Sequence, residues 1–228
     1  MWLKTLFDPH CLLCGLISNS RICTDCFRLL PIITTACHGC GLPTTQSVNY
    51  CGACLNENFS FDACVSLMTY QGMTQSLIAH FKQGGNIELG EALGLLLYRH
   101  LQEKINNGMS VDLIVPVPVY FKVQQQRGFN QAEVIAKILA KQWSIPIDIT
   151  FCSQVNAVSP QKGLNLKQRK SNLINSFIIN KDVSHIRHLI LVDDIVTTGA
   201  TVDYLSGLFK KGGVQKITVA SLARTIRH

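Results

Sequence analysis

The chain has 228 residues, of which 47% are hydrophobic and 15% are charged, so it can hold one full α/β domain with a small appendage. Its formal net charge is +7, and this surplus lies beyond residue 63, which favours a phosphate-rich partner such as a nucleotide or a nucleic acid, although a solvated basic surface would look the same. The sequence has no apolar run of membrane-spanning length and no signal-peptide pattern, which excludes membrane insertion and predicts a cytoplasmic protein.

Eight cysteines near the start of the chain form four C-x-x-C pairs: Cys11/Cys14, Cys23/Cys26, Cys37/Cys40 and Cys51/Cys54. Two such pairs complete a tetrahedral four-cysteine zinc site, and a closed site of this kind is structural. Disulfides are the competing interpretation, but cytosolic thiols stay reduced. The sequence therefore predicts a double zinc ribbon over residues 1–58 with two structural Zn²⁺ ions. Pairing in sequence order and crossed pairing both fit the spacing.

Residues 59–228 alternate expected strands with expected helices. The strands are predicted at residues 63–70, 111–117, 145–149, from 189 to the acids at 193–194, and 216–222. The helices are predicted at residues 73–82, 87–105, 131–143 and from 202 to the glycines at 212–213, with Thr201 as a possible N-cap. This alternation predicts a doubly wound parallel sheet, in which ligands bind beyond the carboxyl ends of the strands.

Two stretches before the last strands carry donors suited to phosphate. The first runs from Val115-Pro116-Val117-Pro118 to Arg127-Gly128-Phe129-Asn130-Gln131, where a strand leads into a helix. Lys122, Arg127 and Asn130 can donate to phosphate oxygens there, while an ordinary strand exit is the alternative.

The second stretch, residues 161–173, holds four basic side chains and no acid: Lys162, Lys167, Arg169 and Lys170. Such a composition predicts a mobile loop that meets an anion. A solvated basic loop and a nucleic-acid contact are the alternatives, and the nucleic-acid role is compatible with the first.

The stretch with the clearest chemistry follows the apolar run at residues 189–192. It places Asp193 and Asp194 before a small-residue loop made of Thr197, Thr198, Gly199, Ala200 and Thr201. A loop of small residues at a helix N-terminus directs backbone N–H groups at an anion. Two acids beside it suit the hydroxyls of an attached sugar, with a divalent metal nearby. The pattern predicts a sugar 5-phosphate site; an acidic turn after a buried strand is the alternative.

This stretch resembles the PRPP-binding motif of type I phosphoribosyltransferases. The resemblance implies that Asp193 and Asp194, which would also be the catalytic residues, hold the ribose hydroxyls in the presence of Mg²⁺. It implies that residues 197–201 hold the 5-phosphate, and that the basic loop closes over PRPP. The pyrophosphate-binding residues would be Lys122, Arg127, Asn130 and Lys162.

Taken together, the cysteine pairs and the motifs that follow them resemble the ComF family of competence proteins, of ComFC and GntX type. The resemblance implies a role in natural transformation, in which the protein handles incoming single-stranded DNA. The DNA-binding residues would be Lys162, Lys167, Arg169 and Lys170, and further partners would be other DNA-uptake or DNA-processing proteins. The alternative is a metabolic phosphoribosyltransferase that displaces pyrophosphate from PRPP with an unidentified nucleophile.

Overall fold

The computed structural model describes residues 9–83, 85–105, 110–156 and 173–226, and these contain a four-stranded sheet in the order β1-β6-β5-β2. The strands are β1 (Ala63–Thr69), β2 (Leu113–Pro116), β5 (His188–Val196) and β6 (Lys216–Arg224). All three strand pairs are parallel. The inner strand β5 therefore has its carboxyl end in the middle of one edge of the sheet, where ligands bind in open α/β folds.

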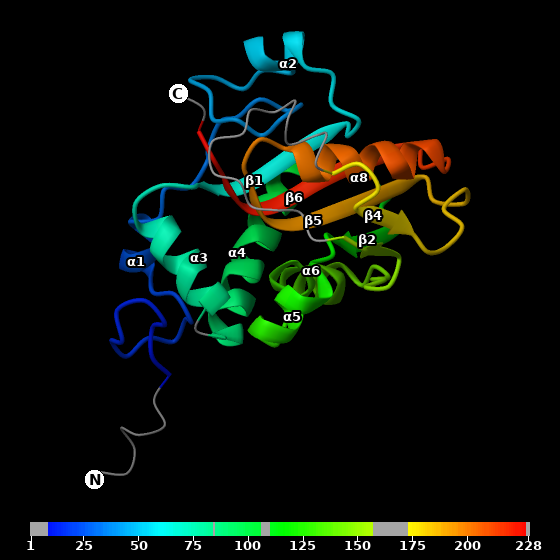
Figure 1. Ribbon diagram of the computed structural model, residues 1–228. Helices are drawn as coiled ribbons and strands as arrows, with labels where there is room; N and C mark the ends of the chain where they lie inside the picture. Colours follow the sequence, from blue (N-terminus) through cyan, green and yellow to red (C-terminus); the bar gives the residue numbers. More distant parts are fainter. Residues whose placement is uncertain (1–8, 84, 106–109, 157–172, 227–228) are drawn as a thin grey trace.

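Helices cover both faces of this sheet (Figure 1). One face packs against α3 (Met73–Gln83), α4 (Ile87–Ile105) and α6 (Gln131–Trp143), and the other packs against α8 (Ala200–Lys211). Beside α8 lies an antiparallel hairpin made of β3 (Cys152–Gln154) and β4 (Phe177–Ile179). The predicted class, a doubly wound parallel α/β sheet with a small cysteine-rich N-terminal domain, is confirmed.

The apolar patterns of the sequence explain these layers. In α4, Leu89, Leu93, Leu97 and Leu101 recur every fourth residue, so they form one stripe, and all four are buried against the sheet. In β5, residues 189–192 are fully buried because helices cover both faces of the strand. The same burial fixes the position of the acids that follow in β5.

The cysteine-rich segment runs along the free edge of β1. It contains the short helices α1 (Thr24–Arg28) and α2 (Gly52–Asn56), and between them Ile32 forms an antiparallel bridge with Met68. The Ile33 N–H donates to the Leu67 carbonyl at 2.9 Å. In Figure 1, α1 lies next to α3, whereas α2 lies beyond β1 on the side of α8. The segment therefore covers a sheet edge and contacts the α/β domain in two separate places.

The structure differs from the sequence prediction in several local elements. A short helix, α5 (Phe121–Arg127), occupies part of the segment expected as a phosphate-gripping loop. The strand expected at 145–149 is reduced to one parallel bridge between Ile114 and Ile147. Helix α8 begins at Ala200 with Gly199 as its N-cap, so Thr201 lies inside the first turn and does not cap the helix. Among the described helices, none has the length and apolarity needed to cross a membrane.

Candidate functional site

The two acids singled out by the sequence lie near the carboxyl end of β5. The Asp194 N–H donates to Oδ1 of Asp193 at 2.8 Å, and Oδ2 of Asp194 is 2.5 Å from Nζ of Lys82. Lys82 belongs to the last turn of α3, and both partners of this ion pair are largely shielded from solvent. Sequence reasoning missed Lys82, because a single lysine at the end of an amphipathic helix carries no local signal of a distant partner.

The charge balance of this pair is unusual. Burial raises the pKa of Asp193, and the adjacent charge of Asp194 raises it further. The Lys82 ammonium lowers it only in part, so the pKa of Asp193 reaches about 8. Asp193 therefore exchanges a proton near neutral pH, whereas Asp194 is paired with a cation. A carboxyl group in this state can accept a hydrogen bond from a sugar hydroxyl or take up a proton.

The segment that follows, residues 197–201, is here called the Thr/Gly loop. Gly199 has φ +83°, a backbone conformation that favours glycine, and a Cβ at that position would be in ordinary contact with the ring of Phe59 at 3.4 Å. The N–H of Ala200 donates to Oγ1 of Thr198 at 3.3 Å. The loop leads directly into the N-terminus of the 12-residue helix α8, which favours an anion beside it.

A buried arginine lies behind the Thr/Gly loop and was not singled out from the sequence. Arg224, the last residue of β6, is 1% exposed. Its Nη1 donates to the Val196 carbonyl at 3.0 Å and to the Thr197 carbonyl, while its Nε donates to the Cys40 carbonyl at 2.9 Å. Within the described chain its hydrogen-bond acceptors are all backbone carbonyl oxygens. Arg224 thus holds the start of the Thr/Gly loop against the cysteine-rich domain.

The three donors predicted after β2 have different surroundings. Asn130 is buried and caps α6: its Oδ1 accepts from the Ala132 N–H at 3.0 Å, and its Nδ2 donates to the Val117 carbonyl at 3.0 Å. Lys122 and Arg127 are exposed on α5, and Nη1 of Arg127 donates to Oε1 of Gln131 at 3.2 Å. The structure thus gives Asn130 a clear structural role, and phosphate binding by the three residues stays a prediction.

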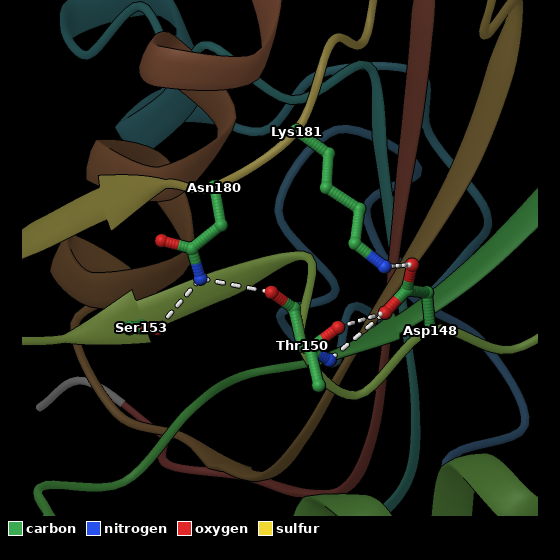
Figure 2. A network of polar contacts seen from close by, with 5 residues as sticks. All are labelled: Asp148, Thr150, Ser153, Asn180 and Lys181. Carbon is green, nitrogen blue, oxygen red and sulfur yellow. Dashed lines mark hydrogen bonds and ion pairs between the residues drawn. The ribbon is translucent and has the colours of Figure 1, made fainter.

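Strands β3 and β4 flank the predicted basic loop, and a polar network anchors their base (Figure 2). Lys181 lies 2.5 Å from Oδ2 of Asp148, and Thr150 donates to Oδ1 of Asp148 through its N–H and its hydroxyl. Nδ2 of Asn180 donates to the Thr150 carbonyl at 2.8 Å and to Oγ of Ser153 at 2.6 Å. The hairpin therefore has a fixed base. The predicted loop residues lie outside the described chain: Lys162, Lys167, Arg169 and Lys170.

The eight paired cysteines gather into two groups in sequence order. The first cysteine group is Cys11, Cys14, Cys23 and Cys26, and the second cysteine group is Cys37, Cys40, Cys51 and Cys54. Within each group all four sulfur atoms lie within 4.8 Å of one another. The closest cross-pair distances are 3.9 Å in the first group, and 3.7 and 3.5 Å in the second. Tetrahedral zinc with bonds of about 2.3 Å requires about 3.8 Å between sulfurs, so both groups fit zinc.

The surroundings of the thiols also suit a metal. Backbone N–H groups donate to sulfur in both groups, from Cys23 to Cys11 at 3.3 Å and from Cys51 to Cys37 at 3.2 Å. Burial alone would raise the pKa of Cys51, but hydrogen bonds from neighbouring backbone and thiol groups outweigh it and lower this pKa to about 7. Burial raises the pKa of Cys40 and Cys54 instead, so these thiols would release their protons when the metal binds.

Comparison with known proteins agrees with this domain arrangement. Residues 2–55 match the family described as double zinc ribbon domain, which confirms the predicted ribbon. Competence protein F from Haemophilus influenzae is 31% identical over 229 residues, covering 97% of this chain and 100% of that protein. DNA utilization protein YhgH from Escherichia coli K12 is 32% identical over 221 residues, covering 95% of this chain and 97% of that protein. Competence protein ComFC from Bacillus subtilis is 25% identical over 218 residues, covering 91% of this chain and 85% of that protein.

Two solved structures are similar to part of this chain. A purine phosphoribosyltransferase from Pyrococcus horikoshii covers 60% of this chain and 72% of its own, with 20% identity and a TM-score of 0.35. Glutamine phosphoribosylpyrophosphate amidotransferase from B. subtilis covers 57% of this chain and 25% of its own, with 15% identity and a TM-score of 0.38.

Proposed function

Because this chain belongs to the protein family that includes competence protein F and DNA utilization protein YhgH, we propose that it acts in competence, where it handles single-stranded DNA during natural transformation in the cytoplasm. In this proposal the cysteine-rich domain, residues 1–58, is structural. The α/β domain, residues 59–228, binds PRPP or a related ribose phosphate, and its basic loop binds DNA. Other DNA-uptake or DNA-processing proteins would be its partners.

The observation that carries the ribose phosphate proposal is the arrangement at the carboxyl end of β5. Asp193 and Asp194 precede the Thr/Gly loop with only Ile195 and Val196 between them, so hydroxyl acceptors and a phosphate cradle lie a few residues apart on one edge of the sheet. A ribose 5-phosphate carries its hydroxyls and its phosphate on one small molecule, so a single ligand could contact both. The acids would hold the 2- and 3-hydroxyls, and the loop with the α8 N-terminus would hold the phosphate.

The residues at this edge fit Mg²⁺ bound together with PRPP. Mg²⁺ is usually held by one or two carboxylates together with substrate phosphate oxygens, and Asp193 and Asp194 supply such carboxylates. Mg²⁺ would offset the negative charge that accumulates when a pyrophosphate group approaches two acids. Lys82 already offsets part of this charge through its ion pair with Asp194. It would therefore share the neutralisation of the acid pair with the metal.

Single-stranded DNA is held by positive grooves, and its affinity for them falls as salt rises. The densest basic run in the sequence is the loop containing Lys162, Lys167, Arg169 and Lys170, between the two strands of the anchored hairpin. Of the aromatic residues near this edge, Phe121 is 64% exposed on α5, so some base stacking is available but little sequence preference is expected. If the same loop closes over PRPP, the two ligands compete.

The experiment that tests this proposal is fluorescence anisotropy of a labelled oligonucleotide, with PRPP and Mg²⁺ titrated in at fixed salt. PRPP should release DNA from the wild-type protein, and replacing Lys167, Arg169 and Lys170 together with Gln should weaken DNA binding. A triple variant of exposed lysines elsewhere, Lys137, Lys141 and Lys211, is the matched control for lost charge. Undiminished DNA affinity in the loop variant would show that DNA binds elsewhere on the molecule, and the proposed role of the loop would be wrong.

One observation favours the alternative, a phosphoribosyltransferase that uses PRPP. The raised pKa of Asp193, which burial and the charge of Asp194 produce, would let this carboxyl group take a proton from an attacking nucleophile near neutral pH. Asp193 and Asp194 would orient the ribose, and Lys122, Arg127 and Lys162 would contact the leaving pyrophosphate. Mass spectrometry of products formed from PRPP with candidate amines and bases tests this alternative. Steady turnover with one acceptor would support it, and pyrophosphate release no faster than in buffer alone would exclude it for the acceptors tried.

A further inference from the structure

We propose that Arg224 couples the second cysteine group to the Thr/Gly loop, so that anion binding by the loop depends on the metal held by Cys37, Cys40, Cys51 and Cys54. This proposal rests on the proposed phosphate-binding role of the loop. The first cysteine group takes no part in it. Arg224 is a positioning residue here, because it contacts the backbone of the loop and not the ligand.

The contacts of Arg224 join two regions that are far apart in the sequence. Its Nε donates to the carbonyl of Cys40, a ligand of the second cysteine group, and its Nη1 donates to the carbonyls of Val196 and Thr197. These carbonyls immediately precede or begin the Thr/Gly loop. A planar guanidinium reaches acceptors on separate sides with fixed geometry, which a lysine ammonium cannot do. A shift in the Cys40 backbone would therefore be passed to the loop.

The buried positive charge of Arg224 also makes its link between the second cysteine group and the Thr/Gly loop depend on the metal. A buried cation needs a compensating negative charge, yet the hydrogen bonds of Arg224 within the described chain all end on carbonyl oxygens. Four thiolates outweigh the charge of one zinc ion, so an occupied second cysteine group is anionic. Because Cys40 belongs to that group, the metal-loaded site would provide the missing charge. Loss of the metal would remove this charge and release the Cys40 backbone to which Arg224 donates.

Packing around the second cysteine group strengthens this connection. A Cβ on Gly41 would lie 2.9 Å from Sγ of Cys64 in β1, and the Cys64 N–H donates to the His38 carbonyl at 3.0 Å. Phe59 packs against the buried cysteines of this group, and its ring also lies close to Gly199. Phe59 thus lies between the second cysteine group and the Thr/Gly loop, in addition to the contacts of Arg224.

The first cysteine group contacts a different part of the molecule. Its segment is tied to α4 by the ion pair between Nη1 of Arg21 and Oε2 of Glu91 at 2.8 Å. Figure 1 places α1, which belongs to this group, beside α3 and on the other side of β1 from α2. It therefore provides an internal control: a ligand at the Thr/Gly loop should perturb one metal site and leave the other unchanged.

The test uses the full-length protein loaded with ¹¹³Cd, whose NMR spectrum reports each cysteine site separately. Addition of PRPP with Mg²⁺ should move the resonance of the second cysteine group and leave that of the first in place. Assignment follows from Cys14→Ser, which should alter the first site only. If PRPP binds, as calorimetry measures, and the second resonance does not move, the coupling is absent and the proposal is overturned. This measurement needs no substitution at Arg224, so it remains decisive if that position tolerates none.

A second measurement follows hydrogen exchange of the loop without any ligand. Arg224→Lys should speed exchange of the amides at residues 197–201 by about tenfold, and should weaken PRPP binding by a similar factor, because it loses hydrogen bonds from a charged donor. Arg187→Lys, at an exposed position at the opposite end of the sheet, should change neither quantity. Unchanged loop exchange in Arg224→Lys would overturn the coupling. Faster exchange in a protein whose wild type binds no PRPP would instead support the coupling and refute the proposed ligand.

Discussion

The side chain of Asp193 lowers the free energy of unfolding by an amount that depends on pH. In the folded chain, burial and the charge of Asp194 raise the pKa of Asp193 from 3.8 to about 8, whereas the unfolded chain exposes it to water. Between these two values the folded chain holds a proton that the unfolded chain has released. The free energy of unfolding therefore falls as pH rises from about 4 to about 8.

Asp193→Asn should remove this pH-dependent loss. We expect the free energy of unfolding of the variant, relative to that of the wild type, to increase by about 1–3 kcal/mol from pH 5 to pH 8, with Lys82 offsetting part of the effect. Urea unfolding at both pH values, in buffer without Mg²⁺ or chelator, measures the difference. Because the zinc thiols titrate equally in both proteins, their contribution cancels. An equal stability difference at the two pH values would show that Asp193 titrates normally.

Single residues also show where sequence reasoning reaches its limit. Asp193, Asp194 and the Thr/Gly loop were predicted together because they are contiguous, and the structure places them at the carboxyl end of an inner strand. Lys82 was missed because its partner Asp194 lies 112 residues away in the chain. Arg224 was missed because Thr197, Val196 and Cys40 lie 27, 28 and 184 residues from it, and no local pattern marks these contacts. Such long-range polar contacts are set by tertiary packing, which local periodicity does not describe.

Among helices, the contact between α3 and α4 depends on a glycine. A Cβ on Gly90 of α4 would lie 2.2 Å from the ring of Phe81 in α3, and that ring is fully buried and cannot swing outward. Gly90→Ala should therefore destabilise the protein by about 1–3 kcal/mol, although alanine is the better helix former by about 1 kcal/mol. Thermal or urea unfolding measures the change.

Gly207→Ala in α8 is the matched comparison. The nearest atom to its added Cβ would be the Ser60 hydroxyl oxygen at 3.3 Å, which can rotate away. This variant should be close to neutral or slightly stabilising. If Gly90→Ala proved as stable as Gly207→Ala, the close packing of α3 on α4 would be refuted.

The long, periodic elements were predicted best. The helix expected at residues 87–105 has those bounds in the structure, because its leucine stripe is regular and asparagine-glycine follows it. The three-residue strands β3 and β4 were not predicted, since segments that short show no periodicity. At 145–149 the alternating isoleucines suggested a strand, but Pro146 lacks an N–H, and the segment makes a single bridge to Ile114.

Across the entire chain, the two cysteine groups differ in exposure. Cys14 of the first group is exposed and two of its partners are half-buried, whereas three of the four cysteines in the second group are buried. Purified protein should contain two zinc ions per chain, and a chromophoric chelator should remove them in two phases, the first group losing its metal first. Cys14→Ser should abolish only the fast phase. Release in a single phase, or disulfides in place of metal, would contradict this account.

The central claim is that the acid pair and the Thr/Gly loop form a ribose phosphate site, and isothermal titration calorimetry of PRPP with Mg²⁺ tests it most directly. Asp193→Asn combined with Asp194→Asn should abolish detectable binding while circular dichroism shows an intact fold, because the amides cannot ionise to bind Mg²⁺ and accept hydrogen bonds from the ribose hydroxyls as carboxylates do. The control, Asp25→Asn combined with Asp182→Asn, removes two exposed acids outside the site and should bind PRPP as the wild type does. PRPP affinity in the site variant equal to that of the wild type would contradict the claim.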